Sequence, residues 1–229
     1  MVHCETPTGV LNQIDQILSI LQDEGILTIV DAVSSLGGTT VPVSDIDICI
    51  GGSQKCFSAP PGLTTISVSR DAWDIIVDKD QKTFYSNLAV WKEMWFEEEY
   101  FPYTHLVSNL YALNEAMNLI LEEGLEDVFE RHEKSAERCR DMAEDIGLEL
   151  FPEEEELSSP TVTALRAEGV AKRIQKRMNE DYDVLLATSL GDLEENVLRI
   201  GHMGYNADLE KVEFVMEALS EVVPKLDLQ

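Results

Sequence analysis

The sequence predicts an α/β fold with a largely parallel sheet, followed by a smaller α+β unit. Helical and strand patterns alternate over the first 69 residues, which favours an α/β layer. The strand candidates end at polar or glycine residues, and residues 148–229 combine short strands with helices. A chain of 229 residues is long enough for one large core, or for one domain with a smaller partner.

The first helix is predicted over residues 11–23, where apolar side chains recur at helical spacing and Gly25 closes the pattern. These side chains fall on one face: Leu11, Ile14, Ile17, Leu18 and Leu21. Three strand candidates follow, at residues 26–30, 46–50 and 63–69. Ligands of open α/β sheets bind beyond the carboxyl ends of the strands. We therefore expect Asp31 and residues 53–55, which follow the first two strands, to lie at one cleft.

Two long helices are predicted next, over residues 105–124 and 125–146, and Gly147 ends the second. The first carries an apolar stripe of Leu106, Leu110, Leu113, Met117 and Leu121. The last part contains a strand at 161–166, a helix at 170–179, strands near 184–187 and 197–200, and a helix at 208–222. We therefore divide the chain into a large-domain part (1–110), connecting helices (111–147) and a small α+β domain (148–229).

The formal net charge of −27, with 17 Lys and Arg against 44 Asp and Glu, excludes several kinds of partner. Nucleic acids and anionic membranes need a basic surface, and the sequence offers none. Such acidity is typical of proteins in a high-salt cytoplasm and of ordinary acidic enzymes alike. The N-terminus resembles no secretory signal, no apolar run approaches the roughly 20 residues of a membrane helix, and the four cysteines form no C-x-x-C pair. We expect a cytoplasmic protein.

Asp31 and Lys55 are the strongest candidates for chemistry, because each follows a strand and both can enter one cleft. An acid at the end of a buried strand is costly unless it meets a cation. Pyridoxal phosphate (PLP) uses such a pair: a lysine amine condenses with its aldehyde, and a carboxylate pairs with its pyridinium nitrogen. Ser53 and Gln54, behind two glycines, add hydrogen-bond donors. The alternative interpretation is a salt bridge between Asp31 and Lys55 without a ligand.

Five stretches, in order along the chain, resemble one enzyme family: HCETPTGVLNQI, IVDAVSSLGG, GGSQKCFSAPPGL, FPYTHLVSNLYALNEA and VLRIGHMG. They are similar to the class V aminotransferases, and the nearest group is the alanine–glyoxylate and serine–pyruvate (or serine–glyoxylate) aminotransferases. The resemblance implies the type I fold of PLP-dependent transferases, with residues 1–110 as the remainder of the PLP-binding large domain. It also implies a homodimer that transfers an amino group from alanine or serine to glyoxylate or pyruvate.

The resemblance implies a role for each matching residue. Lys55 would bind PLP as a Schiff base and, once released, move the substrate proton, and Asp31 would keep the pyridine nitrogen protonated. Val33 would lie against the ring, and Thr6 would contact the phenolic oxygen. The implied phosphate contacts are Gln54, Ser53 and, from the neighbouring subunit, Thr104. Arg199 would bind the substrate carboxylate, for which its planar fork is suited.

Simpler interpretations exist for several of these residues. Arg199 could form a surface ion pair, and Thr6 and Thr104 could cap helices. We expect packing rather than catalytic roles for two histidines: His3 should be packed in a core, and His202 should shape the loop beside Arg199. Their spacing does not match a metal site, and we expect none.

The sequence departs from the family in one large respect, since the N-terminal part of the large domain has no counterpart. We therefore expect a truncated reading frame, one half of a split gene, or a degenerate copy. Three hypotheses remain: an aminotransferase, active alone or only when completed by the missing N-terminal segment; a non-catalytic fragment or partner subunit of a split aminotransferase; and another class V enzyme such as a cysteine desulfurase. The last would need a histidine where this chain has Gln54, and a catalytic cysteine on a mobile loop.

Overall fold

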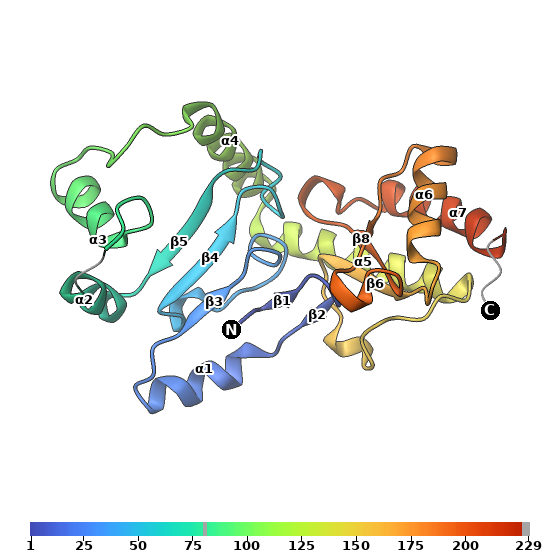
Figure 1. The fold of residues 1–229 in the computed structure, drawn as a ribbon, viewed down its shortest axis with the longest axis horizontal. Coiled ribbons are helices and arrows are strands. Elements are labelled where there is room, and N and C mark those ends of the chain that lie inside the picture. The colour runs from blue at the N-terminus through green and yellow to red at the C-terminus, as the bar shows by residue number, and fades with distance from the viewer. Residues whose placement is uncertain (80–81, 226–229) are drawn as a thin grey trace.

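The computed structural model describes residues 1–79 and 82–225. Figure 1 shows two packed units side by side along the long axis, with the N-terminus near the middle and the C-terminus at the far end of the second unit. The first unit is built on a sheet with the order β3-β4-β5, and the second on a sheet with the order β6-β8-β7. This arrangement agrees with the predicted α/β fold.

The first sheet is only partly parallel. Strand β3 (Ile29–Asp31) runs parallel to β4 (Ile48–Gly52), but β5 (Thr64–Val68) returns antiparallel to β4. The chain start extends the parallel part, because Asp31 N–H donates to Met1 O at 2.9 Å and His3 N–H donates to Asp31 O at 2.8 Å. The link between β4 and β5, residues 53–63, contains no helix to carry the chain across the sheet, so the next strand must run back.

Helix α1 (Ile14–Asp23) covers one face of this sheet through Ile14 and Leu18, which are almost fully buried. Both pack in a core with Val30, Ile46 and Cys49. Gly25 adopts a φ of +65° just after the helix, as its predicted closing role requires. The predicted start at residue 11 is wrong, because Leu11 belongs to a hairpin of β1 (Cys4–Glu5) and β2 (Val10–Leu11).

The segment after β5 holds helices that the periodicity analysis did not predict. Helix α2 (Arg70–Asp78) begins after Ser69, whose hydroxyl accepts a hydrogen bond from Ala72 N–H at 3.1 Å. Helix α3 (Leu88–Trp91) continues into a π-helical stretch, Lys92–Glu97. Aromatic rings connect this stretch to the next loop, since Trp95 stacks on Phe101 with centroids 4.4 Å apart.

The second unit begins where two long helices cross from the first, α4 (Val107–Glu123) and α5 (Leu125–Asp145). Its other elements are β6 (Val162–Arg166), α6 (Ala171–Tyr182), β7 (Ala187–Thr188), β8 (Val197–Gly201) and α7 (Leu209–Val222). Short 3-10 turns lie at Val43–Asp45, Glu155–Leu157, Gly191–Leu193, Gly204–Asn206 and Val223–Lys225. Antiparallel pairing of β8 with β6 and β7 forms the sheet. Cys139 and Ala143 of α5 lie in the same core as Leu165, Ile174 and Met216, so α5 packs as part of this unit.

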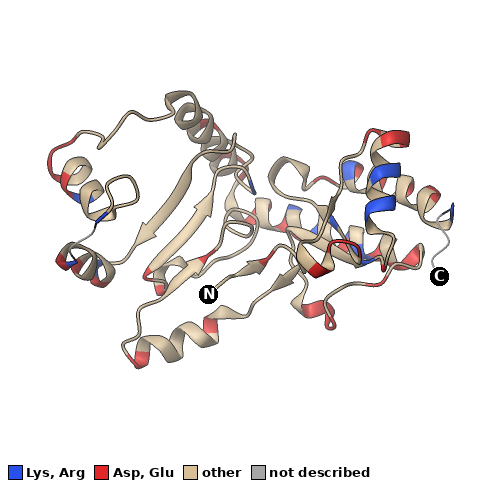
Figure 2. Ribbon diagram, in the orientation of Figure 1, with Lys and Arg blue, Asp and Glu red and all other residues tan. Residues whose placement is uncertain are grey.

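Apolar side chains remain exposed on the first unit. Leu113 of α4 is buried, but Leu121 on the predicted apolar stripe is 68% exposed. On the sheet, Ile29 of β3 is 55% exposed. Figure 2 shows Lys and Arg gathered on the second unit, and only five of the 17 lie within residues 1–110. No helix in the described part of the chain is both long and apolar enough to cross a bilayer.

Candidate active site

Lys55 sits on a tight turn that directly follows β4. Ser58 N–H donates to Lys55 O at 2.9 Å, and Ser58 has a positive φ of 56°, so the chain reverses just beyond the lysine. The Lys55 side chain is half-buried. Within residues 1–79 and 82–225, its ammonium group makes no hydrogen bond or ion pair. The turn therefore presents a cation that no described anion neutralises.

Asp31 ends β3, next to the strand that leads to Lys55. Its Oδ1 accepts the N–H of Val33 at 2.9 Å, which turns the chain after the strand. The side chain is exposed and so is Ile29 of the same strand, so this strand end is not buried as the argument for a cation partner assumed. No ion pair joins Asp31 to Lys55 or to another cation in the described residues, which removes the salt-bridge alternative.

Gly52 brings Val33 and Gln54 close together. A Cβ built on Gly52 would lie 3.1 Å from Val33 Cγ1 and 3.1 Å from Gln54 Oε1, so a larger residue would push both side chains away. Gln54 itself is exposed. The bare glycine thus leaves a shallow space bounded by Val33 on one side and Gln54 on the other.

Ser53 has a different environment from its neighbours. It is fully buried; its hydroxyl donates to Pro60 O at 2.7 Å and accepts from Leu63 N–H at 3.3 Å. Both hydrogen bonds lie within the loop that carries Lys55. The structure therefore gives Ser53 a role in shaping this loop, and its hydroxyl already has its partners there.

Thr6 and Arg199 meet between the two units. Arg199 on β8 donates from Nε to Thr188 O at 2.9 Å and from Nη1 to Thr6 O at 3.2 Å. Its Nη2 makes no hydrogen bond to any described residue, so one edge of the fork remains for a ligand. Partial burial lowers the pKa of Arg199 from its ordinary value. The Thr6 hydroxyl contacts Ser34 Oγ at 2.5 Å.

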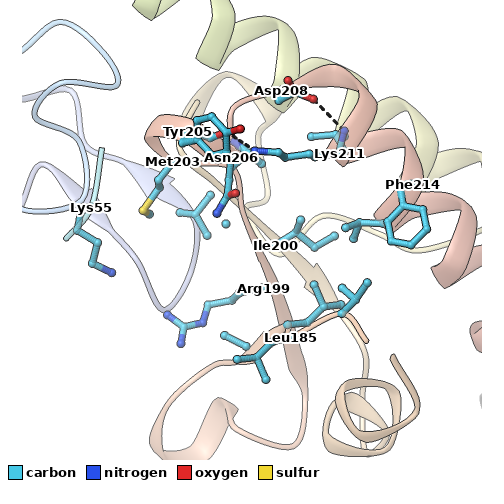
Figure 3. A pocket seen from close by; sticks show the side chains of 18 of the residues that line it. Lys55, Leu185, Arg199, Ile200, Met203, Tyr205, Asn206, Asp208, Lys211 and Phe214 are labelled. Atoms are coloured by element: carbon cyan, nitrogen blue, oxygen red, sulfur yellow. Dashed lines mark hydrogen bonds between the residues drawn. The ribbon is translucent and has the colours of Figure 1, made fainter. Parts of the chain in front are cut away.

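One cavity of about 910 Å³ contains Thr6, Lys55 and Arg199 among its lining residues. Figure 3 shows Lys55 and Arg199 reaching toward each other from the first and second units, with Met203, Tyr205 and Asn206 along one rim. A lysine amine and an arginine fork in one cavity can bind a carbonyl compound that also carries a carboxylate. The structure thus brings together the predicted nucleophile and the predicted carboxylate ligand.

Thr104 lies apart from this cavity. It is exposed, on the irregular segment between the π-helical stretch and α4, and is absent from the cavity lining. It caps no helix, because α4 begins at Val107 without a side-chain cap. Thr6 likewise lies between β1 and β2 rather than at a helix start.

Three of the four histidines (His3, His132 and His202) and all four cysteines are buried. His3 contacts Ser35 Oγ at 2.9 Å, and His202 is held by Thr163 Oγ1 at 2.8 Å and Pro160 O at 3.0 Å. All four cysteines are free and buried, and burial raises the pKa of Cys56 to about 12. No group of three His, Cys, Asp or Glu side chains in the described ranges could hold a metal ion.

The sequence analysis missed two residues beside the site. Ser34 joins Thr6 through its hydroxyl, and its carbonyl accepts from Thr161 Oγ1 at 2.7 Å, which links the two units behind the cavity. Gly204 packs against the Lys55 turn, where a built Cβ would lie 2.6 Å from Cys56 O. Its place in the stretch quoted as VLRIGHMG was the only signal, because a contact between residues 56 and 204 leaves no local pattern in the sequence.

Comparisons with known proteins agree with one another. The sequence profile described as "Aminotransferase class-V" matches residues 1–191. An uncharacterized aminotransferase of Methanocaldococcus jannaschii is 42% identical over 92% of this chain and 56% of its own length. The alanine–glyoxylate aminotransferase of Mus musculus is 32% identical over 97% of this chain and 56% of its own length.

A solved aminotransferase structure has a closely similar fold. The pyridoxamine–pyruvate aminotransferase of Mesorhizobium loti has a TM-score of 0.93 at 33% identity, covering 98% of this chain and 59% of that one. The described fold is therefore part of the type I fold of PLP-dependent transferases. The chain spans a little over half the length of the relatives it matches.

Proposed function

The chain belongs to the class V aminotransferases, and on that premise we propose that it takes part in PLP-dependent transamination in the cytoplasm. The proposed donor is a small amino acid, alanine or serine, and the proposed acceptor is glyoxylate or pyruvate. The observation that carries this proposal is that Lys55 and Arg199 line one cavity, each with donor groups that no described residue occupies. The relatives differ in their substrates, which leaves the donor to be measured.

The residues near Lys55 fit PLP, although of the expected cofactor contacts only Thr6 and Lys55 themselves line the cavity. Asp31 carries an exposed carboxylate without a cation partner in the described residues. Its carboxylate is therefore available to pair with a pyridinium nitrogen. Val33 and Gln54 flank the space above Gly52, where a Cβ would intrude. Thr6 contributes a hydroxyl beside Ser34. We propose that these residues hold the ring and its phosphate, with Ser53 acting through the loop it shapes.

When bound, PLP supplies an aldehyde that reacts with amines and a ring that takes up electron density. Lys55 would attach the cofactor through its Nζ and, after exchange with the substrate amine, carry the proton to and from the substrate α-carbon. Arg199 would hold the substrate carboxylate through Nη2 while Nε and Nη1 keep the fork anchored on Thr188 and Thr6. The arginine therefore fixes the substrate orientation in both half-reactions.

The experiment is a spectroscopic titration of the purified chain with PLP. The proposal expects the visible absorption band of lysine-bound PLP, its loss in Lys55→Ala, and its decay when alanine or serine is added. Lys211→Ala is the matched control, because Lys211 lines the same cavity and should leave the band unchanged. A band that survives Lys55→Ala would contradict the proposal.

A second candidate function is that of a non-catalytic partner subunit of a split aminotransferase. The exposed apolar residues of β3 and α4 favour it, since exposed patches of this kind mark interaction surfaces. A separately encoded polypeptide with the remaining large-domain strands would then cover them. In the titration, a band that forms only after such a polypeptide is added supports this candidate, and a band from the chain alone counts against it.

A cysteine desulfurase is disfavoured. Such chemistry needs an accessible thiolate, whereas Cys4, Cys49, Cys56 and Cys139 are all buried. Burial also raises the pKa of Cys139 to about 12, which holds this thiol protonated at neutral pH.

We also propose a homodimer in which Thr104 serves the site of the other copy. The exposed position of Thr104, away from the cavity of its own chain, supports this arrangement.

A further inference from the structure

The turn after β8, Gly204–Asn206, touches both halves of the candidate site. It follows Arg199 closely along the chain, and it packs against the residues next to Lys55. Tyr205 N–H donates to Ser58 Oγ at 2.7 Å, and a Cβ on Gly204 would collide with Ser58 Oγ and with Cys56 O. Gly204 has a φ of +56°, which favours glycine. Any shift of this turn is therefore transmitted to the turn that carries Lys55.

Two consecutive residues of α5 hold the backbone of Gly204 from the other side. His132 Nε2 accepts the Gly204 N–H at 2.8 Å, and Arg131 Nη1 donates to Gly204 O at 2.6 Å and to Ala207 O at 2.9 Å. The backbone amide and carbonyl of one residue are thus both bound by side chains from a single helix. These contacts anchor the turn to α5.

Both α5 side chains are themselves fixed. His132 is fully buried and donates from Nδ1 to Val128 O at 2.7 Å, which leaves Nε2 as the acceptor for Gly204. Arg131 pairs with Glu123 through two hydrogen bonds, Nε to Oε1 at 2.6 Å and Nη2 to Oε2 at 3.1 Å. Neither side chain lines the cavity, so neither can touch a substrate there.

We propose that Arg131 and His132 are positioning residues: they clamp Gly204 and thereby set how the Lys55 turn and the Arg199 strand face each other. The proposal rests on the proposed function for its consequence in catalysis. The coupling between α5 and the Lys55 turn is a structural claim, and it does not depend on the proposed function. Loosening the clamp should release the Lys55 turn and misplace the carboxylate ligand relative to the lysine.

The test uses Arg131→Gln with Arg138→Gln as the matched control. Arg138 lies on the same helix and pairs with Glu213 at 2.8 Å, but it does not contact the Gly204 turn. Hydrogen exchange followed by mass spectrometry measures peptides containing residues 55–58 and 203–207. Removal of hydrogen bonds to a buried backbone should speed exchange in both peptides by about tenfold in Arg131→Gln, and by less than about twofold in Arg138→Gln.

A second pair of variants separates positioning from folding. His132→Leu leaves the Gly204 N–H without an acceptor, whereas His132→Gln offers an amide oxygen near the place of Nε2. The first should reproduce the faster exchange at 55–58, and the second should recover most of the protection. In the active protein, His132→Leu should raise KM for the amino acid more than it lowers kcat, because Arg199 is displaced.

The outcomes are distinguishable. Faster exchange confined to residues 203–207, or equal effects of Arg131→Gln and Arg138→Gln, would overturn the proposal, because the turn would then not be coupled to Lys55. If the parent chain binds no PLP at Lys55, the proposed function fails, yet the exchange data still decide whether the clamp exists.

Discussion

The Ser53 hydroxyl illustrates how one side chain can support a site without facing it. Its bonds to Pro60 and Leu63 close the loop that presents Lys55, and the residue is fully buried. The resemblance to the class V aminotransferases had implied a phosphate contact at this position. If Ser53 shapes the loop, its hydroxyl stabilises the chain even in the absence of PLP. If it serves only to bind phosphate, its removal should not change the stability of the PLP-free chain.

We predict that Ser53→Ala lowers the free energy of unfolding by about 1–3 kcal/mol without any cofactor, because two hydrogen bonds of a buried hydroxyl, to Pro60 O and from Leu63 N–H, are lost. Urea unfolding of the PLP-free chain measures this. Ser67→Ala on β5 is the control, because Ser67 is exposed and should change stability little. Equal stabilities of Ser53→Ala and the parent chain would favour a hydroxyl reserved for the phosphate.

We predict that Arg199→Lys raises KM for the amino acid by about ten- to a hundredfold, since an anchored guanidinium that holds the carboxylate through Nη2 is replaced by an unanchored ammonium point charge. Steady-state kinetics with the best donor measures the change. The lysine also cannot reach Thr188 O and Thr6 O together. An unchanged KM would mean that the carboxylate binds elsewhere.

At this scale the sequence identified the residues that carry charge or reactivity, but not their environments. Lys55 and Arg199 stand in distinctive local motifs and do meet in one cavity. The exposure of Asp31, the buried hydroxyl of Ser53 and the clamp on Gly204 all depend on contacts between distant segments, which periodicity does not record.

At the scale of elements, β8 and the turn after it connect the candidate site to the core of the second unit. His202 directly follows this strand in a fully buried position, where burial lowers its pKa to about 3. Nδ1 donates to Pro160 O and Nε2 accepts from Thr163, so the neutral ring satisfies both neighbours. Protonation would remove the acceptor and place a charge in the core.

We predict that His202 makes the protein sensitive to acid. Its pKa in the folded state lies below the ordinary value of 6.5, so the unfolded chain takes up the proton first as the pH falls. The contribution to stability is fully present above about pH 6.5 and is lost toward pH 3, by up to about 1.4 kcal/mol per pH unit. Urea unfolding between pH 7.5 and 5 should show a shallower decline in His202→Gln than in the parent. Parallel declines would contradict this assignment.

Long periodic helices were the most predictable elements. The predicted helices 105–124, 125–146 and 208–222 correspond to α4, α5 and α7 within a few residues. By contrast, α2 was missed because its nine residues are short and carry three acids. The antiparallel return of β5 was missed because the direction of a strand depends on the link before it rather than on its own residues.

At the scale of the whole molecule, the exposed apolar side chains of α4 and the position of Thr104 outside the cavity support the proposed second copy. Leu121 is one of these side chains, and Thr104 shortly precedes the helix. Burial of such residues between two copies would remove apolar surface from water and bring one copy's threonine toward the other copy's site.

We predict complementation between two inactive variants. Lys55→Ala lacks the amine, and Thr104→Val lacks the hydroxyl that is proposed to serve the other copy. In a mixed dimer, one site has an intact Lys55 and receives an intact Thr104. Random mixing should therefore restore about a quarter of the parent activity. If the mixture stays as inactive as its components, Thr104 acts within its own chain or not at all.

The central claim is that Lys55 presents an amine to a carbonyl ligand, because its ammonium group has no partner in the described residues and lines the same cavity as Arg199. The most direct test is to incubate the chain with PLP, reduce with borohydride, digest, and identify the labelled peptide by mass spectrometry. The account predicts one dominant adduct on the peptide containing Lys55, which forms at low PLP concentration and is slowed by Arg131→Gln. Labelling spread over the surface lysines, with Lys55 unmodified, would contradict it.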